Sequence, residues 1–256
     1  MTTDNLPEHF QPVIADQQFT FACHPGVPCF TECCRELDLA LTPYDVLRLK
    51  RQLQLTSGQF LEQYVIIEWD EEQLFPTCYL TMVDDGRASC VFVNEQGCSV
   101  YADRPGSCRT YPVGRGAARG EGDTPAESLI LLRESHCQGF AAGGQQTVRA
   151  YLLDQGVEVY NRFNDALLPL LQHLKIQSRT FRPSRQQLDQ YMLALYDLDQ
   201  FRRQMADGRI ALQRPLTPAQ LQGLAGDDEE LLLLGVRWLL QEFFGDYPGT
   251  VASPCR

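Results

Sequence analysis

The sequence predicts an α+β protein in which an irregular, cysteine-rich module with a small antiparallel sheet precedes a mainly helical C-terminal region. Nine of the ten cysteines lie between residues 23 and 137. Beyond residue 144, apolar residues recur at helical spacing, and Gly and Pro separate the periodic stretches. We therefore predict two domains, a cysteine-bearing module at 15–145 and a helical subdomain at 146–250 that packs on it.

Capping signals predict two helices within the module. Thr42 can cap the open N–H groups of a helix, Pro43 suits its first turn, and Asp45 favours the positive end of its dipole. The apolar residues that follow form a helical stripe. A second, shorter helix is predicted to begin at Thr56 and Ser57.

Strand signals are fewer. The apolar segments 78–82 and 88–93 flank the turn-prone residues 84–86, which predicts a β-hairpin. Residues 128–132 are predicted to add one strand. The Gly-rich segment 114–122 fits neither a Walker loop nor a Rossmann fingerprint, so we predict a flexible loop there.

The C-terminal region is predicted to consist of helices between breakers. The predicted helices cover about 145–155, 157–175, 184–206, 217–224 and 227–245. Their apolar residues are expected to form a core, and their acidic residues are expected to cap helices or face water.

Charge and hydropathy argue against binding to nucleic acid and against association with a membrane. The net charge is -11 and the pI is about 4.8, which disfavours non-specific binding to nucleic acid or to anionic membranes. The amino terminus lacks a basic start followed by an apolar run, and no segment approaches a membrane-spanning length. We therefore expect a cytoplasmic protein, whose thiols are kept reduced.

In a reducing compartment, a high density of cysteines indicates metal ligation rather than disulfides. The predicted metal ligands are Cys23, Cys29, Cys33, Cys34, Cys90, Cys98, Cys108 and Cys137. Eight thiolates suffice for two four-sulfur sites or for one larger cluster with spare ligands. Cys78 lies in an apolar strand and is predicted to be a core residue, whereas Cys255 lies in the C-terminal tail.

Soft thiolates suit zinc or iron–sulfur clusters. Because the spacings are irregular and no His stands at a finger-like position, we favour an iron–sulfur cluster such as 4Fe–4S over zinc. His24 and His136 adjoin predicted ligands, and whether either is a ligand stays open. Arg104 and Arg109 flank Cys108 and are predicted to act at the centre, by offsetting thiolate charge or binding an anion.

The cysteine pattern resembles a known family. A cysteine-rich loop ends in Cys33-Cys34 and is followed by Leu-Thr-Pro-x-Asp, then by Cys-x7-Cys-Ser-Val-Tyr-x2-Arg-Pro-x2-Cys-Arg-x-Tyr-Pro. This order is similar to that of the YkgJ-type cysteine-cluster family, over about residues 20–165. The resemblance implies a zinc- or iron-chelating domain. The first gap, Cys23-x5-Cys29, is longer than the x2 gap of the family's common form.

Three functions remain open at this point. The chain is predicted to hold a cluster with a redox role and to have a redox partner. The first alternative is an enzyme that uses the centre, because a related domain occurs in a flagellin lysine methylase; the acidic surface would then suit a basic protein substrate. The second alternative is a structural zinc protein with a helical interaction surface.

Overall fold

The structure is a computed structural model that describes residues 7, 9–69, 73–120, 124–213 and 215–246. The chain forms two compact units, each made of two segments. Unit 1 comprises residues 1–40 and 79–165, and unit 2 comprises residues 41–78 and 166–256. The two domains expected at 15–145 and 146–250 stay a prediction.

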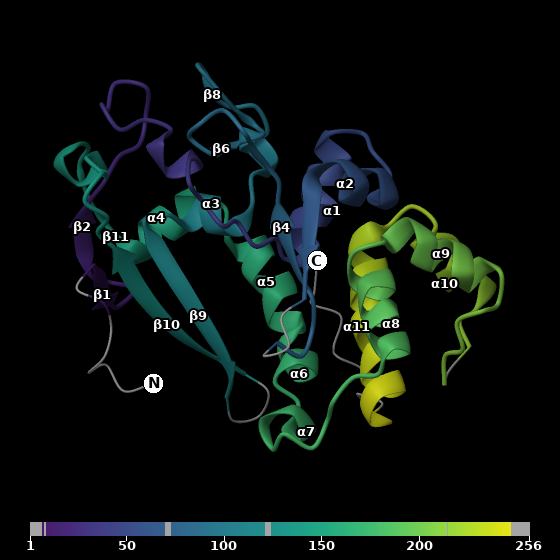
Figure 1. The fold of residues 1–256 in the computed structure, drawn as a ribbon. Coiled ribbons are helices and arrows are strands. Elements are labelled where there is room, and N and C mark those ends of the chain that lie inside the picture. The colour runs from purple at the N-terminus through teal and green to yellow at the C-terminus, as the bar shows by residue number, and fades with distance from the viewer. Residues whose placement is uncertain (1–6, 8, 70–72, 121–123, 214, 247–256) are drawn as a thin grey trace. The chain divides into compact units, whose positions relative to one another are not determined.

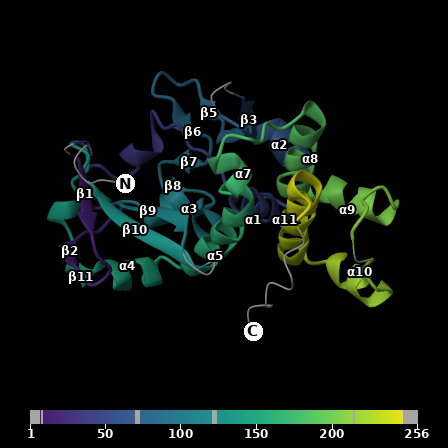
Figure 2. The same cartoon turned by 90° about the horizontal axis from the view of Figure 1, so that it is seen from below.

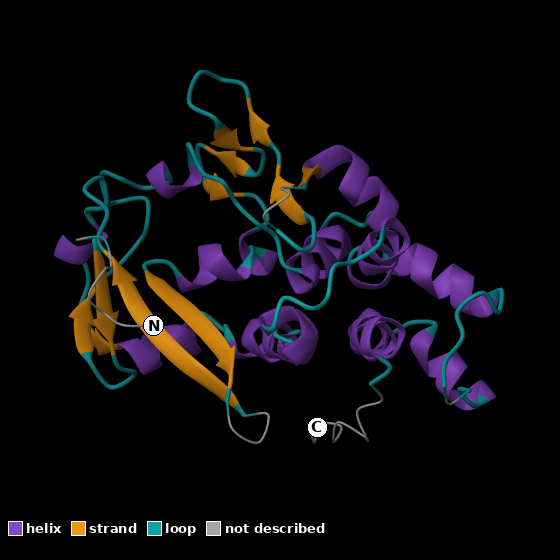
Figure 3. Ribbon diagram, turned by 60° about the horizontal axis from the view of Figure 1, so that its bottom comes forward, coloured by secondary structure: helices purple, strands orange, loops and turns teal. Residues whose placement is uncertain are grey.

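The α+β class is confirmed by several small antiparallel sheets and by helices toward the C-terminus. Apart from β3 and part of β4, the described strands belong to unit 1. Figure 3 shows the strands in orange and the helices in purple. No helix in the described part of the chain is long and apolar enough to cross a membrane.

The largest sheet of unit 1 has three antiparallel strands in the order β1–β10–β9 (Figure 1). They are β1 (Phe10–Val13), β9 (Val113–Arg119) and β10 (Pro125–Leu132). Val13 lies opposite Leu129, and Val113 lies opposite Leu131, so all four side chains share one face. This face forms the core of unit 1 together with Phe19, Phe21, Val148 and Tyr151.

Gly-rich β9 corrects one prediction. The flexible loop predicted at 114–122 is wrong for residues 114–119, which belong to this strand, and residues 121–123 lie outside the described residues. A Cβ at Gly114 would lie 2.8 Å from Ile130, so glycine permits the close approach of β10. Pairing along the whole of β9 thus imposes a strand on residues of low strand propensity.

Three two-stranded ladders complete the strands of unit 1. They pair β2 (Gln18–Thr20) with β11 (Gln145–Thr147), β5 (Met82–Val83) with β6 (Ser89–Cys90), and β7 (Val93–Asn94) with β8 (Gly97–Cys98). The hairpin predicted around residues 84–86 is confirmed in β5 and β6, but it has only two residues per strand. The preceding strand, β4 (Thr77–Leu80), pairs with β3 instead.

Short helices link these strands. They are the 3-10 turns η2 (Glu32–Cys34), η3 (Tyr101–Asp103) and η5 (Gly139–Ala141), and the helices α3 (Gly106–Thr110), α4 (Val148–Asp154) and α5 (Glu158–Ala166). Arg115 of β9 donates to both carboxylate oxygens of Asp165 at 2.8 and 2.9 Å, which ties the sheet to α5.

Unit 2 begins with the two helices predicted from caps, and both are confirmed. In α1 (Pro43–Gln52), the Thr42 hydroxyl accepts from the Asp45 N–H, and the Asp45 carboxylate accepts from the Thr42 N–H. In α2 (Ser57–Tyr64), Thr56 and Gln59 form the same box. The chain continues directly from α2 into β3 (Val65–Glu68) (Figure 2).

The C-terminal helices of unit 2 are α6 (Leu168–Leu171), α7 (Leu174–Gln177), α8 (Arg185–Leu195), α9 (Leu198–Ala206), α10 (Pro218–Leu224) and α11 (Asp228–Phe244). Helix α8 packs along α11 (Figure 1). Two predicted helices are interrupted. Residues 157–175 divide into α5, α6 and the start of α7, and Pro169 lies in the first turn of α6. Residues 184–206 break at Asp197, which caps α9.

Candidate metal centre

The first cysteine loop, residues 23–34, folds back on itself through successive tight turns. The Val27 N–H donates to the His24 carbonyl at 2.9 Å, and the Glu32 N–H donates to the Cys29 carbonyl at 3.0 Å. Turn η2 then ends the loop. Prolines within the loop favour such turns, since they fix one backbone torsion in advance. Consecutive cysteines are thereby placed close together in space.

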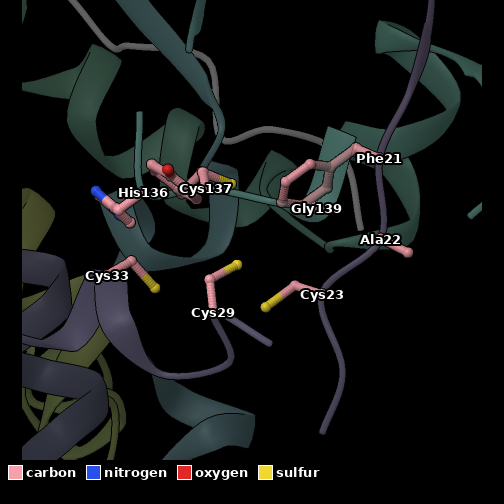
Figure 4. A pocket seen from close by; sticks show the side chains of 9 residues that line it. Phe21, Ala22, Cys23, Cys29, Cys33, His136, Cys137 and Gly139 are labelled. Carbon is pink, nitrogen blue, oxygen red and sulfur yellow. The ribbon is translucent and has the colours of Figure 1, made fainter. Parts of the chain in front are cut away.

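Four of the predicted ligands line a single pocket. They are Cys23, Cys29, Cys33 and Cys137, and the pocket is completed by Phe21, Ala22, Tyr111, His136 and Gly139. In Figure 4 the sulfurs of Cys23, Cys29 and Cys33 point toward the space between them, and Cys137 closes the pocket from the far end of the cysteine-bearing segment. Two regions that are distant in sequence therefore contribute thiols to one place.

Backbone contacts hold the Cys137 segment against the first loop. The Gln138 N–H donates to the Cys29 sulfur at 3.1 Å, and the Ala22 N–H donates to the Gly139 carbonyl at 3.1 Å. Cys137 itself packs against the core of unit 1. The pocket is thus anchored on its inner side by the same apolar core that supports the β1–β10–β9 sheet.

The thiols of this pocket influence one another electrostatically. Burial, and then the nearby thiols Cys33, Cys29 and Cys137, raise the pKa of Cys23 to about 11, while Arg104 acts in the opposite direction. The pKa of Cys33 is also raised, first by its side-chain hydrogen bond with Cys34 and then by burial. Thiols crowded in this way stay protonated unless a cation stabilises their thiolates.

Cys90 of β6 and Cys98 of β8 do not line the pocket, but one pocket thiol acts on both of them electrostatically. Burial is the main cause that raises the pKa of each, and Cys33 contributes to both shifts. Cys33 is thus within electrostatic range of both hairpin thiols. Arg104 acts against the rise in the pKa of Cys98, as it does for Cys23, so one guanidinium acts on thiols from two stretches of the chain.

The two remaining predicted ligands are less directly placed. Cys34 contacts Cys33 but does not line the pocket. Cys108 is half-buried on α3 and does not line it either. The structure therefore brings four of the eight cysteines to one pocket, sets Cys34 beside it, and leaves Cys90, Cys98 and Cys108 outside its lining.

The two predicted arginines are both held by the protein. Arg104 is 8% exposed, donates to the Tyr101 carbonyl at 2.7 Å and to the Gln155 side chain at 2.6 Å, and stacks on the Tyr101 ring. Arg109 donates to the Gln155 carbonyl at 2.8 Å and to the Ala102 carbonyl. Arg109 thus fixes the end of α4 against α3, the helix that carries Cys108.

The two histidines differ. His24 is exposed, and its Nδ1 accepts from the Gly26 N–H at 3.1 Å within the loop. His136 lines the pocket, and its Nε2 lies 3.7 Å from a Glu134 carboxylate oxygen. Of the two, only His136 therefore lines the pocket.

Cysteines in the described part of the chain form no disulfide with one another. Cys78 is fully buried in β4, which confirms its prediction as a core residue, and burial raises its pKa to about 12. Cys255 lies outside the described residues. Within those residues, no three His, Cys, Asp or Glu side chains are already arranged as the ligands of a metal ion.

Tyr111 and Glu134 form a polar contact at the site that was not predicted from the sequence. The Tyr111 hydroxyl donates to a Glu134 oxygen at 2.8 Å, and its side chain also interacts with Cys137. Burial, followed by these two partners, raises the pKa of Tyr111. Both residues lie three positions from a predicted ligand in the sequence, and this proximity is the signal that could have identified them. The spacing of the cysteines, however, predicts only thiolate ligands and indicates neither residue.

The donor set of the pocket suits a soft metal, because thiolates are the usual ligands of zinc in four-coordinate sites and of iron–sulfur clusters. Residues 22–138 match the family model CxxCxxCC, described as "Putative zinc- or iron-chelating domain". No curated protein and no solved structure shows a significant match to the chain. The matched segment starts one residue before Cys23 and ends one residue after Cys137. Over residues 22–138 the chain is therefore similar to the CxxCxxCC family, and this likeness supports the binding of zinc or iron by the cysteine-bearing segment.

Proposed function

We propose that the chain holds an iron–sulfur cluster on the pocket thiols Cys23, Cys29, Cys33 and Cys137, and that this centre exchanges electrons. The observation that carries the proposal is the convergence of four thiols, from both ends of the matched segment, on one pocket. Four thiolates are the ligand set of a 4Fe–4S cluster.

The other four predicted ligands, Cys34, Cys90, Cys98 and Cys108, are proposed as a second thiolate position. Its support is the contact between Cys33 and Cys34 and the electrostatic influence of Cys33 on Cys90 and Cys98. For Cys108 the support is its position in the sequence pattern. Arg109 would orient this residue by fixing α3.

Arg104 is proposed to offset thiolate charge at both positions. Its guanidinium is buried and acts against the rise in the pKa of Cys23 and of Cys98. A fixed positive charge near thiolates stabilises them and raises the reduction potential of a cluster that they bind. The Gln138 N–H, which donates to the Cys29 sulfur, acts in the same direction.

A bound cluster would supply one-electron oxidation and reduction. The residues of the chain would set how this electron reaches a partner. Cys23 is exposed, whereas Phe21 and Gly139, on the inner side of the pocket, are buried. The centre would therefore lie near the protein surface on the Cys23 side, where a redox partner could approach.

Anaerobic purification tests the identity of the metal. We expect iron and acid-labile sulfide in near-equal amounts, a broad absorption near ~400 nm typical of thiolate-ligated clusters, and reversible bleaching by a reductant. Colourless protein that carries zinc and shows no redox signal would contradict the proposal and support the structural-zinc alternative.

A further inference from the structure

Strand β3 exposes apolar side chains on both of its faces. Ile66 is 49% exposed and Ile67 is 50% exposed. Because successive side chains of a strand point to opposite faces, neither face of β3 is covered at these positions. Trp69, which follows the strand directly, is 55% exposed. Three large apolar residues so close together at a protein surface are typical of a binding site for another protein.

The backbone of β3 is also open to pairing. Among the described strands, β3 pairs with β4 alone, so β3 is an edge strand. Edge strands are usually protected against pairing by Lys or Pro, by a bulge or by a cover. The strand sequence, Val65 to Glu68, contains neither Lys nor Pro. An extended segment of another protein could thus add to this edge through main-chain hydrogen bonds.

The charge around β3 indicates the kind of partner. Glu68 ends the strand and is exposed, and the chain carries a net charge of -11. A second copy of the chain would bring the same negative charge to the edge and would be repelled. A basic segment would be attracted instead.

We propose that β3 is a docking edge for an extended segment of another protein in which apolar and basic residues alternate. Apolar residues of the segment would contact Ile67 on one face of the strand and Trp69 just beyond its end, and its basic residues would lie on the other face, which carries Glu68. Strand β3 contributes no thiol to the metal centre, so this proposal does not rest on that centre.

A labelled peptide of alternating Lys and Val, seven residues long, serves as the probe, and its binding to the full-length protein is followed by fluorescence anisotropy. A second peptide, with Pro in place of the central Val, controls for pairing, since Pro removes a main-chain donor. We expect the first peptide to bind at least about tenfold more tightly than the second. Amides of residues 65–68 should become protected from hydrogen exchange when it binds.

The double variant Ile66→Thr, Ile67→Thr keeps two β-branched residues but removes apolar surface. It should lose about tenfold in affinity for the alternating peptide. Leu174→Thr is the matched control, because Leu174 is 69% exposed in the same unit, and it should bind as the unchanged chain does. Equal binding by the double variant, protection confined to other residues, or dimerisation through β3 in sedimentation experiments would each overturn the proposal.

Discussion

Cys137 joins two regions of the chain that are distant in sequence. It packs on the core of unit 1, and the N–H of the next residue, Gln138, reaches the Cys29 sulfur. The Tyr111 hydroxyl interacts with the Cys137 side chain and donates to Glu134. The pocket thiols therefore have a surrounding shell that fixes their positions, as protein metal sites generally do.

The Tyr111→Phe variant tests this shell. It removes the hydroxyl that interacts with Glu134 and Cys137 but keeps the ring in place. We expect the affinity for metal to fall about tenfold, as is common when an outer partner of a ligand is lost. Competition with a chelator measures this affinity. Tyr101→Phe, in which the ring beneath Arg104 is retained, is the control and should bind metal normally; an equal loss in both variants would contradict the role of Tyr111.

At the residue scale, the sequence could predict which residues are candidate ligands but not which of them meet in space. Residue chemistry was enough to nominate the cysteines, because thiols at this density in a reducing compartment indicate metal. The grouping of Cys137 with Cys23 rather than with Cys108 depends on tertiary contacts around η5, which no local spacing encodes. The interaction of Tyr111 with Glu134 is hidden for the same reason.

At the element scale, the pocket depends on how closely η5 approaches the segment that follows β2. A Cβ at Gly139 would lie 2.6 Å from the Phe21 ring and 2.8 Å from the Ala22 carbonyl oxygen. Only glycine therefore allows this approach, which carries Cys137 toward Cys23. The position of Cys137 in the pocket therefore depends on this close backbone approach as well as on the cysteines.

Gly139→Ala should consequently reduce metal binding without touching any thiol. The added methyl group would push the Cys137 segment away from Phe21 and Ala22, and overpacking of this kind typically costs about 1–3 kcal/mol. The metal content per chain and the melting temperature should both fall. Gly144→Ala is the control, since nothing lies within 4 Å of a Cβ there, and it should leave both unchanged. Full metal content in Gly139→Ala would show that the approach is dispensable.

Elements were predictable where their signals are local. Helix α1 begins where Thr42, Pro43 and Asp45 predict it, because the hydrogen bonds of a capping box form between residues of a single turn. Strand β9 was missed because its Gly, Ala and Arg residues have little strand propensity and depend on pairing with β10. The breaks between α5, α6 and α7 fall within a continuous helical pattern, which periodicity does not separate.

At the scale of the whole molecule, each unit has an interior of a different kind. Unit 1 combines an apolar core with the cysteine pocket. Unit 2 contains a buried ion network, in which Lys50, only 4% exposed, lies 3.0 Å from both Asp199 and Asp228. Arg202 contacts both carboxylates as well. Asp228, predicted to cap a helix or face water, is instead buried in this network.

This network makes the stability of unit 2 sensitive to acid. Burial by itself would raise the pKa of Asp199, but the Ser57 N–H and the Lys50 ammonium lower it to about 2, and Asp228 shifts in the same direction. Both pKa values lie below those of the unfolded chain, near ~3.9. The stabilisation is therefore complete above about pH 4 and is lost as the pH falls toward 2.

We expect the free energy of unfolding to decrease by on the order of 1 kcal/mol for Asp199 over this range, after allowance for solvent screening, and Asp228 should change it in the same direction. Urea unfolding followed by tryptophan fluorescence measures it, because both tryptophans, Trp69 and Trp238, belong to unit 2. Asp199→Asn should flatten the dependence on pH, whereas Asp207→Asn, on an exposed ion pair, should not. An unchanged slope in Asp199→Asn would exclude the network as its source.

The most direct test of the metal centre compares two cysteine variants, Cys137→Ala and Cys78→Ala, after identical anaerobic metal loading. Cys137 lines the pocket, whereas Cys78 is a buried core residue of β4. The metal-to-chain ratio should fall in Cys137→Ala, because one pocket ligand is lost, and should match that of the unchanged chain in Cys78→Ala. An unchanged ratio in Cys137→Ala, or equal losses in both variants, would contradict a metal centre at this pocket.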